Sequence, residues 1–280
     1  AEALGMTATL NPFLHPDNPS GIGHVWRGGL NFTGPTLDTF FTNYTAYMTS
    51  MADLAVAGGA DRMLIGSEMV ALTGNSSAEA YWRSLITAVD GIFGGTISYA
   101  ANHTEYAGVP FWDALDEVGV DAYFGLASSA QASGVGNPSV ATITANWAPH
   151  LATLKSFGLG EGKPIVLTEW GCVPQDLTTV EPWNWDPNAT PDPLEQLNAY
   201  QATVTATDLT GDWLGGINFW HWSMPGNDGS AFHLTPASLP GQFLKSYLIP
   251  EPGSFVIFSG LTLLLSRRKS RNRNRGNLGG

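Results

Sequence analysis

The sequence predicts an α/β protein, a (β/α)8 barrel of which six strands are recognisable in the chain. Six short and almost continuously apolar segments alternate with longer segments of helical periodicity, as in repeated βα units. The apolar segments lack a polar face, which is typical of parallel strands that are covered on both sides. The chain has 280 residues, 43% of them hydrophobic, which is enough for one large core.

The strand candidates follow one another through most of the chain. They are residues 5–13, 62–69, 95–102, 118–125, 164–171 and 216–223. An eight-stranded barrel requires two more strands than these. If residues 216–223 form the eighth strand, residues 164–171 form the seventh and residues 62–69 the fourth.

Helical patterns fill the gaps between the strand candidates. Apolar residues recur at helical spacing after Pro35, and Gly58 and Gly59 end this pattern. Ser76 to Glu79 reads as a capping box that opens a helix ending near Gly91. Three further helices are expected at residues 110–115, at 138–157 with a bend at Pro149, and at 193–209. A long loop rich in Pro, Asp, Asn and Trp precedes the last of these, from residue 174 to 193.

The last 31 residues differ in kind from the rest. Residues 1–249 read as one barrel domain, whereas residues 250–280 hold a Pro-Glu-Pro motif, an apolar run at 255–265 and a basic cluster at 267–275. This tripartite order closely resembles a PEP-CTERM sorting signal. The resemblance implies export to the cell surface or medium, contact with the export and sorting machinery, and transient anchoring in the membrane with the basic cluster on the cytoplasmic side. The apolar run alone is shorter than the roughly 20 residues of a membrane-spanning helix.

Charge and cysteine content exclude several classes of function. Residues 1–252 hold 24 acidic against six basic residues, a net charge of −18, which disfavours nucleic acid or an anionic membrane as a partner of the barrel. The single cysteine, Cys172, excludes an internal disulfide and a multi-cysteine metal site. The six histidines lack ligand spacing, and no glycine-rich nucleotide motif is present. We therefore expect neither a metal nor a cofactor.

Two carboxylates stand at the ends of strand candidates. Glu68 ends RMLIGSE and Glu169 ends PIVLTE, and active sites of such barrels lie at the carboxyl ends of the strands. The fourth and seventh strands face each other across the barrel mouth, and two facing carboxylates are the equipment for glycoside hydrolysis. Their shared field would push their pKa values apart. Alternatively, each glutamate pairs with Lys or Arg, but only six cations are available in residues 1–252.

The segments MLIGSEM, SYAAN, FWDALDEVGVDAYFG, KPIVLTEWG and GINFWHW resemble glycoside hydrolase family 113, over roughly residues 1–248. Characterised members of that family are β-mannanases. The resemblance implies a retaining mechanism with Glu68 as the acid/base and Glu169 as the nucleophile. Ser67 stands where many members of the wider clan have an Asn that contacts the sugar 2-hydroxyl.

The same resemblance implies that the first two strands of the barrel lie upstream of Ala1. An incomplete barrel would expose two strand edges. We therefore expect the 280-residue chain to be unstable or inactive by itself.

Other residues near the strand ends are candidates for binding substrate. Tyr123 is a candidate hydrogen-bond donor to the nucleophile, and Trp220 or Trp222 a platform for the sugar, although packing explains such aromatic residues equally well. Further candidates for holding substrate are Asn102, His103, Asn11, His15 and Arg27, and outer positions could be lined by Trp170, Trp183 and Trp185. Asp121 is a weaker candidate that could be structural. Surface positions are expected for Asp113, Asp116, Glu117, Glu161 and Glu195.

The sequence thus predicts an exported retaining β-glycosidase that acts internally on a β-mannan-type polysaccharide or on its oligosaccharides. Two alternatives stay open. One is hydrolysis of another β-linked glycan, because related barrels share the catalytic pair across many substrates. The other is a non-catalytic carbohydrate-binding surface protein, which would need the aromatic residues but not the two glutamates.

Overall fold

The computed structural model describes residues 7–17, 25–132, 136–208, 211, 213–222 and 230–248. The sorting signal predicted at residues 250–280 lies outside the described residues. Among the described residues, no helix combines the length and the apolar character needed to cross a membrane.

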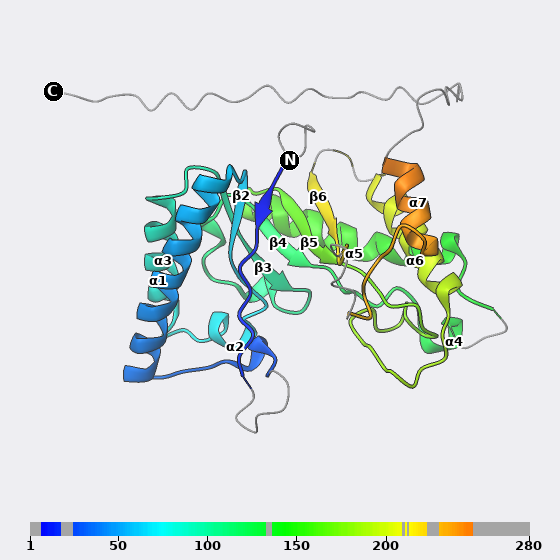
Figure 1. The fold of residues 1–280 in the computed structure, drawn as a ribbon, viewed down its shortest axis with the longest axis horizontal. Helices are drawn as coiled ribbons and strands as arrows, with labels where there is room; N and C mark the ends of the chain where they lie inside the picture. The colour runs from blue at the N-terminus through cyan, green and yellow to red at the C-terminus, as the bar shows by residue number, and fades with distance from the viewer. Residues whose placement is uncertain are drawn as a thin grey trace.

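The described chain forms one curled sheet of six parallel strands (Figure 1). The strands are β1 (Thr9–Leu10), β2 (Arg62–Ser67), β3 (Thr96–Asn102), β4 (Val118–Asp121), β5 (Ile165–Trp170) and β6 (Leu214–Phe219). Each strand pairs in parallel with the next strand along the chain. This order is that of consecutive βα units in a barrel wall, so the predicted succession of strands is confirmed.

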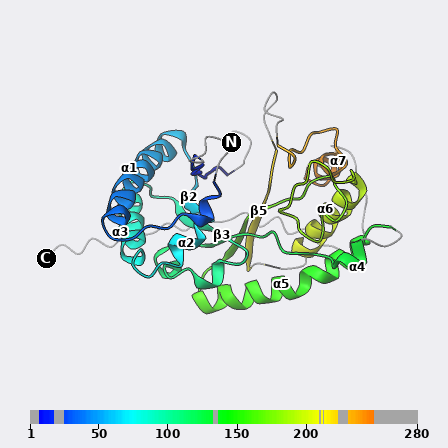
Figure 2. The ribbon, with the colours of Figure 1, turned by 90° about the horizontal axis from the view of Figure 1, so that it is seen from below.

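Helices lie in an arc along one side of the sheet, with α1 and α3 at one end, α5 in the middle and α6 and α7 at the other (Figure 2). Their bounds are α1 (Pro35–Gly58), α3 (Glu79–Asp90), α5 (Val140–Glu161), α6 (Pro193–Asp208) and α7 (Leu239–Leu248). Single turns of α-helix form α2 (Val70–Thr73) and α4 (Ser129–Ala132), and 3-10 turns form η2 (Arg27–Gly29), η3 (Tyr106–Gly108) and η4 (Trp112–Ala114). The helices α1 and α5 end at Gly59 and Gly162 in the left-handed conformation that glycine adopts without strain.

Several local predictions are wrong. The helix expected at residues 110–115 is only the 3-10 turn η4, and the strand expected at 118–125 ends at Asp121. The expected capping box is absent, because the N-cap of α3 is Ala78 and the nearby Ser77 N–H donates instead to Asn75 Oδ1. The first strand is only two residues long. The last strand begins at Leu214 and ends at Phe219, so Trp220 and Trp222 follow the strand rather than alternating on it.

Strand side chains alternate between two faces of the sheet. On one face, Ile65, Tyr99, Val120 and Leu167 join the core beneath the helices, where Trp82 stacks on Phe111 with ring centroids 5.2 Å apart.

Several residues between them, on the barrel interior, are small or polar: Ser98, Gly119, Asp121 and Thr168 are all buried. A Cβ atom on Gly119 would lie 2.4 Å from the Tyr99 carbonyl oxygen. Position 119 therefore has no room for a side chain, and the polar side chains beside it can reach from strand to strand across the interior.

Candidate active site

A cavity of about 740 Å³ lies at the carboxyl ends of the strands. Every strand of the sheet places a lining residue at or shortly after its end. The cavity is lined by Phe13, His15, Trp26, Arg27, Glu68, Asn102, His103, Thr104, Tyr123, Glu169, Trp183, Trp220 and Phe232. Residues that lie more than 200 positions apart in the chain therefore meet in one place.

Most of the candidates named from the sequence line this cavity. The cavity brings together His15, Arg27, Glu68, Asn102, His103, Tyr123, Glu169, Trp183 and Trp220. Trp222 is 51% exposed and bridges to Leu234, outside the described lining. Trp170 is fully buried against Trp147 and Tyr200, so it packs in the core rather than at an outer sugar position.

Glu68 is surrounded by hydrogen-bond donors. Its Oε2 accepts a hydrogen bond from Arg27 Nη2 at 3.1 Å, and its Oε1 accepts one from Asn102 Nδ2 at 2.8 Å. Arg27 also donates from Nε to the Ser67 carbonyl oxygen at 2.7 Å and lies over the Phe13 ring at 4.7 Å. The alternative pairing with a cation is thus realised at Glu68, and the arginine that provides it is itself part of the cavity wall.

The backbone at Glu68 is held in an unusual conformation. Its φ of 49° lies in the left-handed region, which is uncommon for residues other than glycine and clusters at functional sites. The Glu68 N–H donates to the Ala100 carbonyl at 2.8 Å, and the next N–H, of Met69, donates to the Tyr99 hydroxyl at 2.6 Å. Two residues of β3 therefore hold the backbone of Glu68 and of the next residue at the cavity.

A buried carboxylate that the sequence did not single out supports this arrangement. Glu105 is 6% exposed and accepts hydrogen bonds from the Tyr99 hydroxyl at 2.8 Å and from the Asn102 N–H at 2.9 Å. It thereby braces the two residues that hold Met69 and Glu68. Its only signal in the sequence is its place three residues after a strand end. Phe13, Thr104 and Phe232 are further lining residues that sequence reasoning missed.

Glu169 has a different environment. It is 6% exposed, and its Oε2 accepts a hydrogen bond from the Tyr123 hydroxyl at 3.0 Å. Among the described residues, no donor reaches its Oε1. Burial and the nearby Glu68 carboxylate raise the pKa of Glu169 to about 7, although the Tyr123 hydroxyl and Arg27 oppose this shift. Near neutral pH a substantial fraction of Glu169 is therefore protonated.

Aromatic rings form the walls of the cavity. His103 stacks on Trp183 with ring centroids 5.3 Å apart, and Phe13 packs on Trp220 at 5.6 Å. Burial lowers the pKa of His103, so its ring is neutral at neutral pH. Flat apolar faces beside carboxylates suit a ligand with both apolar faces and hydroxyl groups, such as a sugar.

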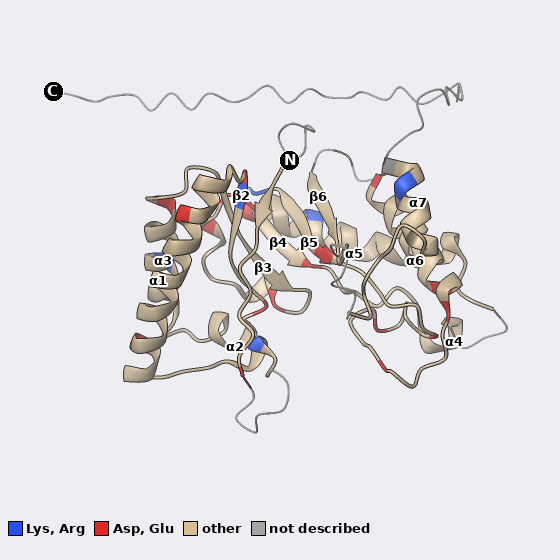
Figure 3. Cartoon of the chain, viewed as in Figure 1, with Lys and Arg blue, Asp and Glu red and all other residues tan. Residues whose placement is uncertain are grey.

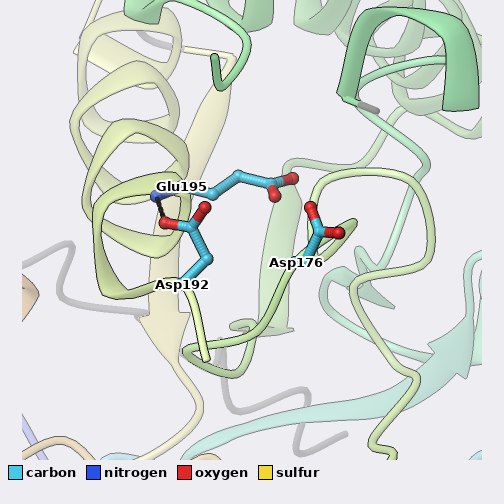
Figure 4. A group of neighbouring side chains, drawn as sticks. All are labelled: Asp176, Asp192 and Glu195. Atoms are coloured by element: carbon cyan, nitrogen blue, oxygen red, sulfur yellow. Dashed lines mark hydrogen bonds between the residues drawn. The ribbon is translucent and has the colours of Figure 1, made fainter. Parts of the chain in front are cut away.

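Asp176, Asp192 and Glu195 form the one group of potential metal ligands among the described residues, with ligand atoms within 4.8 Å of one another (Figure 4). Glu195 is fully buried, so its predicted surface position is wrong. Its carboxylate accepts hydrogen bonds from the N–H groups of Leu177 and Thr179, and Asp192 accepts one from the Glu195 N–H. The group thus anchors the loop at residues 174–193 to α6.

Acidic residues occur throughout the described chain with few basic residues between them (Figure 3). Glu117, expected at the surface, is 8% exposed and pairs with Arg62 at 3.0 Å. Arg83 pairs with Glu79 and Asp113 on the outside.

The buried Glu169 carboxyl predicts how stability depends on pH. Its pKa of about 7 in the folded state lies above the ordinary glutamate value of 4.5. The folded state therefore binds this proton more tightly than the unfolded state. The resulting stability is complete below pH 4.5 and is lost as the pH rises through 7. Glu169→Gln should remove this loss, which is on the order of 3 kcal/mol.

Urea unfolding of the full-length protein, as wild type and as Glu169→Gln, at pH values below 4.5 and above 7, measures the difference. Glu161→Gln, on the exposed end of α5, should keep the wild-type pH dependence. An unchanged pH dependence in Glu169→Gln would show that the pKa of this carboxyl is not raised.

Solved structures share this architecture. A β-1,4-mannanase of glycoside hydrolase family 113 superposes with a TM-score of 0.71 at 23% identity, over 88% of this chain and 74% of the other. The family 113 β-mannanase from Alicyclobacillus acidocaldarius gives a TM-score of 0.67 at 24% identity, with the same coverage. A β-glucuronidase from Ruminococcus gnavus gives 0.52 at 14% identity, over 72% of this chain and 34% of the other. At these identities the likeness shows the fold.

Sequence comparison establishes the family. Comparison with curated proteins gives no match. The sequence profile of Glycoside Hydrolase Family 113, however, matches residues 1–231, which is most of the chain. With the barrel architecture and a cavity at the strand ends that holds two glutamates, the profile match identifies the chain as a glycoside hydrolase of family 113.

Proposed function

We propose that this glycoside hydrolase is a retaining enzyme that cleaves a β-mannan-type polysaccharide internally, with Glu68 as acid/base and Glu169 as nucleophile. The observation that carries the proposal is that both carboxyl groups line one cavity and differ in their contacts. Glu169 is held through Oε2 by Tyr123, which leaves Oε1 to attack the anomeric carbon. Glu68 is held by Arg27 and Asn102 and would protonate the leaving oxygen.

The proton must move for this assignment to work. The raised pKa of Glu169 favours a proton on that residue near neutral pH, whereas a nucleophile attacks in its ionised form. The Tyr123 hydroxyl favours ionised Glu169, because it donates a hydrogen bond to the carboxylate. We infer that the active form carries the single proton of the pair on Glu68. The opposite assignment, with Glu169 as the acid, is the alternative that the raised pKa favours.

The charge of the cavity supports a neutral substrate. Arg27 is the one Lys or Arg in the described lining, and it already contacts Glu68 and the Ser67 carbonyl oxygen. A sugar acid would bring a third negative charge beside Glu68 and Glu169 without a cation to pair with. Mannan, glucan and galactan carry no such charge. Among them, the solved family 113 β-1,4-mannanases favour mannan.

Replacement of each glutamate tests the proposal. In the full-length protein, Glu169→Gln and Glu68→Gln should each lower kcat on mannan by about 100- to 10,000-fold or more, because nucleophilic attack or proton donation is lost. Glu68→Gln should spare a substrate whose leaving group needs no proton. Glu161→Gln, exposed on α5, is the matched control and should keep wild-type activity. The assay is release of reducing sugar from mannan, glucan, galactan and a glucuronide.

The outcomes separate the alternatives. Activity on glucan or galactan but not mannan would change the substrate, and binding of a glycan without hydrolysis of any would favour a binding protein. Trapping with an activated 2-deoxy-2-fluoroglycoside, followed by peptide mapping, identifies the nucleophile. A label on Glu68 would show that Glu68, not Glu169, is the nucleophile. Release of product with inverted anomeric configuration would contradict a retaining mechanism.

The pH profile gives a second test. Because Glu169 must be ionised to attack, kcat/KM should fall as the pH drops below about 7. Tyr123→Phe removes a hydrogen bond that lowers the pKa of Glu169, so this fall should begin at higher pH. Tyr106→Phe, also buried but outside the described cavity lining, should leave the profile unchanged. Equal profiles for Tyr123→Phe and wild type would rule out this role for Tyr123.

We propose further that two more strands close the barrel between β6 and β1. Among the described residues, each of these two strands pairs on one side only, and closure removes the remaining edges. A chain extended upstream in its reading frame should therefore melt cooperatively and hydrolyse glycan. The 280-residue chain should do neither. Calorimetry and the same assay compare them, and a cooperative melt with hydrolysis from the 280 residues alone would refute the proposal.

A further inference from the structure

Asp121 is a third carboxyl group close to the two glutamates, yet it does not line the described cavity. It is fully buried at the end of β4. In the sheet, its Cα is paired with Asn102 of β3 on one side and with Glu169 of β5 on the other. The residue thus lies in the barrel wall directly between two residues of the site.

The side chain of Asp121 contacts the chain just before each glutamate. Its Oδ2 accepts a hydrogen bond from the Ser67 hydroxyl at 3.2 Å, and its Oδ1 accepts one from the Thr168 hydroxyl at 2.7 Å. Ser67 directly precedes Glu68, and Thr168 directly precedes Glu169. One side chain therefore links β2 to β5 across the barrel interior, at the point where both strands deliver their carboxyl groups.

The surroundings of Asp121 disfavour its charge. None of the ion pairs in the described part of the chain includes it. Burial, followed by the charges of Glu169 and Glu68, raises the pKa of Asp121 well above its usual range, while Thr168 and Arg27 lower it. A neutral carboxyl group at this position adds no third charge to the site and still offers two oxygens for hydrogen bonds.

A hydrophobic residue could also be buried at position 121, but it would leave the hydroxyl groups of Ser67 and Thr168 without this hydrogen-bond partner. Ser67 and Thr168 are both buried, at 2% and 6% exposed. The hydrogen bonds from Arg27 and Asn102 fix the side chain of Glu68. They do not fix the distance between the carboxyl groups of Glu68 and Glu169. Among the described residues, Asp121 is the one whose side chain accepts hydrogen bonds from the ends of both β2 and β5.

We propose that Asp121 is a positioning residue for the two catalytic carboxyl groups. It holds the residue before each of them and so fixes how far apart they lie. The inference rests on the proposed function, because the separation of the two groups matters only if they act together on a glycosidic bond. An error of about 1 Å in such a site can lower the rate by about 100-fold.

Substitutions in the full-length protein test this role. Asp121→Ala should lower kcat by about 100-fold with little change in KM. Asp121→Asn stays neutral and keeps an oxygen for Thr168, so it should restore most of the activity. Ser67→Ala and Thr168→Val should each lower kcat by about 10-fold. Neither substitution should lower kcat further when it is combined with Asp121→Ala, since both act through the same contact.

A readout that needs no turnover separates this inference from the proposed function. In carbon-13 carboxyl NMR titrations, Asp121→Ala should lower the pKa of Glu169, because Glu68, whose charge raises it, is free to move away. Ser98→Ala is the matched control for Ser67→Ala. Its hydroxyl is equally buried on the interior face but donates to the Glu117 carbonyl at 2.9 Å. This control should change neither kcat nor the titration of Glu169.

Each outcome decides one of the two claims. The positioning role is overturned if Asp121→Ala keeps the wild-type kcat and Glu169 titration, or if Ser98→Ala loses as much activity as Ser67→Ala. If the wild type hydrolyses no glycan, the proposed function fails. The NMR titration then decides by itself whether Asp121 sets the separation of the carboxyl groups.

Discussion

Two carboxyl groups, the half-buried Glu68 and the buried Glu169, share one cavity that contains a single arginine among its described lining residues, and the rest of the site is arranged around this constraint. The unfavourable burial is offset in different ways. Glu68 accepts hydrogen bonds from Arg27 and Asn102. Glu169 receives one hydrogen bond, from Tyr123, and its pKa rises. A proton donor and a nucleophile must differ in protonation at the same pH, so the proposed roles require the proton to leave Glu169 and lie on Glu68 when Glu169 attacks.

The fold delivers these groups because consecutive parallel strands all end at one edge. Each βα unit returns the chain to the same side, so Glu68, Asn102, Tyr123 and Glu169 meet although each comes from a different unit. Alternation along the strands separates the two tasks of the sheet. Residues such as Tyr99 and Val120 pack against the helices. Their neighbours on the interior face, such as Asp121, carry the hydrogen bonds beneath the site.

Sequence patterns predicted the elements better than they predicted burial. The β2 and β5 strands were placed to within a residue or two because their apolar runs are bounded by charged residues and glycine. Predictions for single polar residues fared worse. Glu195 is expected at the surface because it lies on a predicted helix rather than at a strand end, yet it is fully buried and holds the backbone of a loop. No local pattern indicates that the preceding loop folds back and brings its N–H groups to the first turn of that helix.

The sequence alone determined the order of the βα units, the positions of Glu68 and Glu169 at strand ends and the acidic character of the barrel, because these follow from local periodicity and composition. Tertiary structure alone decided which groups touch the glutamates. Arg27 lies 41 residues before Glu68, Tyr123 lies 46 before Glu169, and Asp121 reaches partners 54 and 47 positions away. Such contacts depend on strand register and on the curl of the sheet. Those properties arise only when the whole core packs, so no local stretch of sequence specifies them.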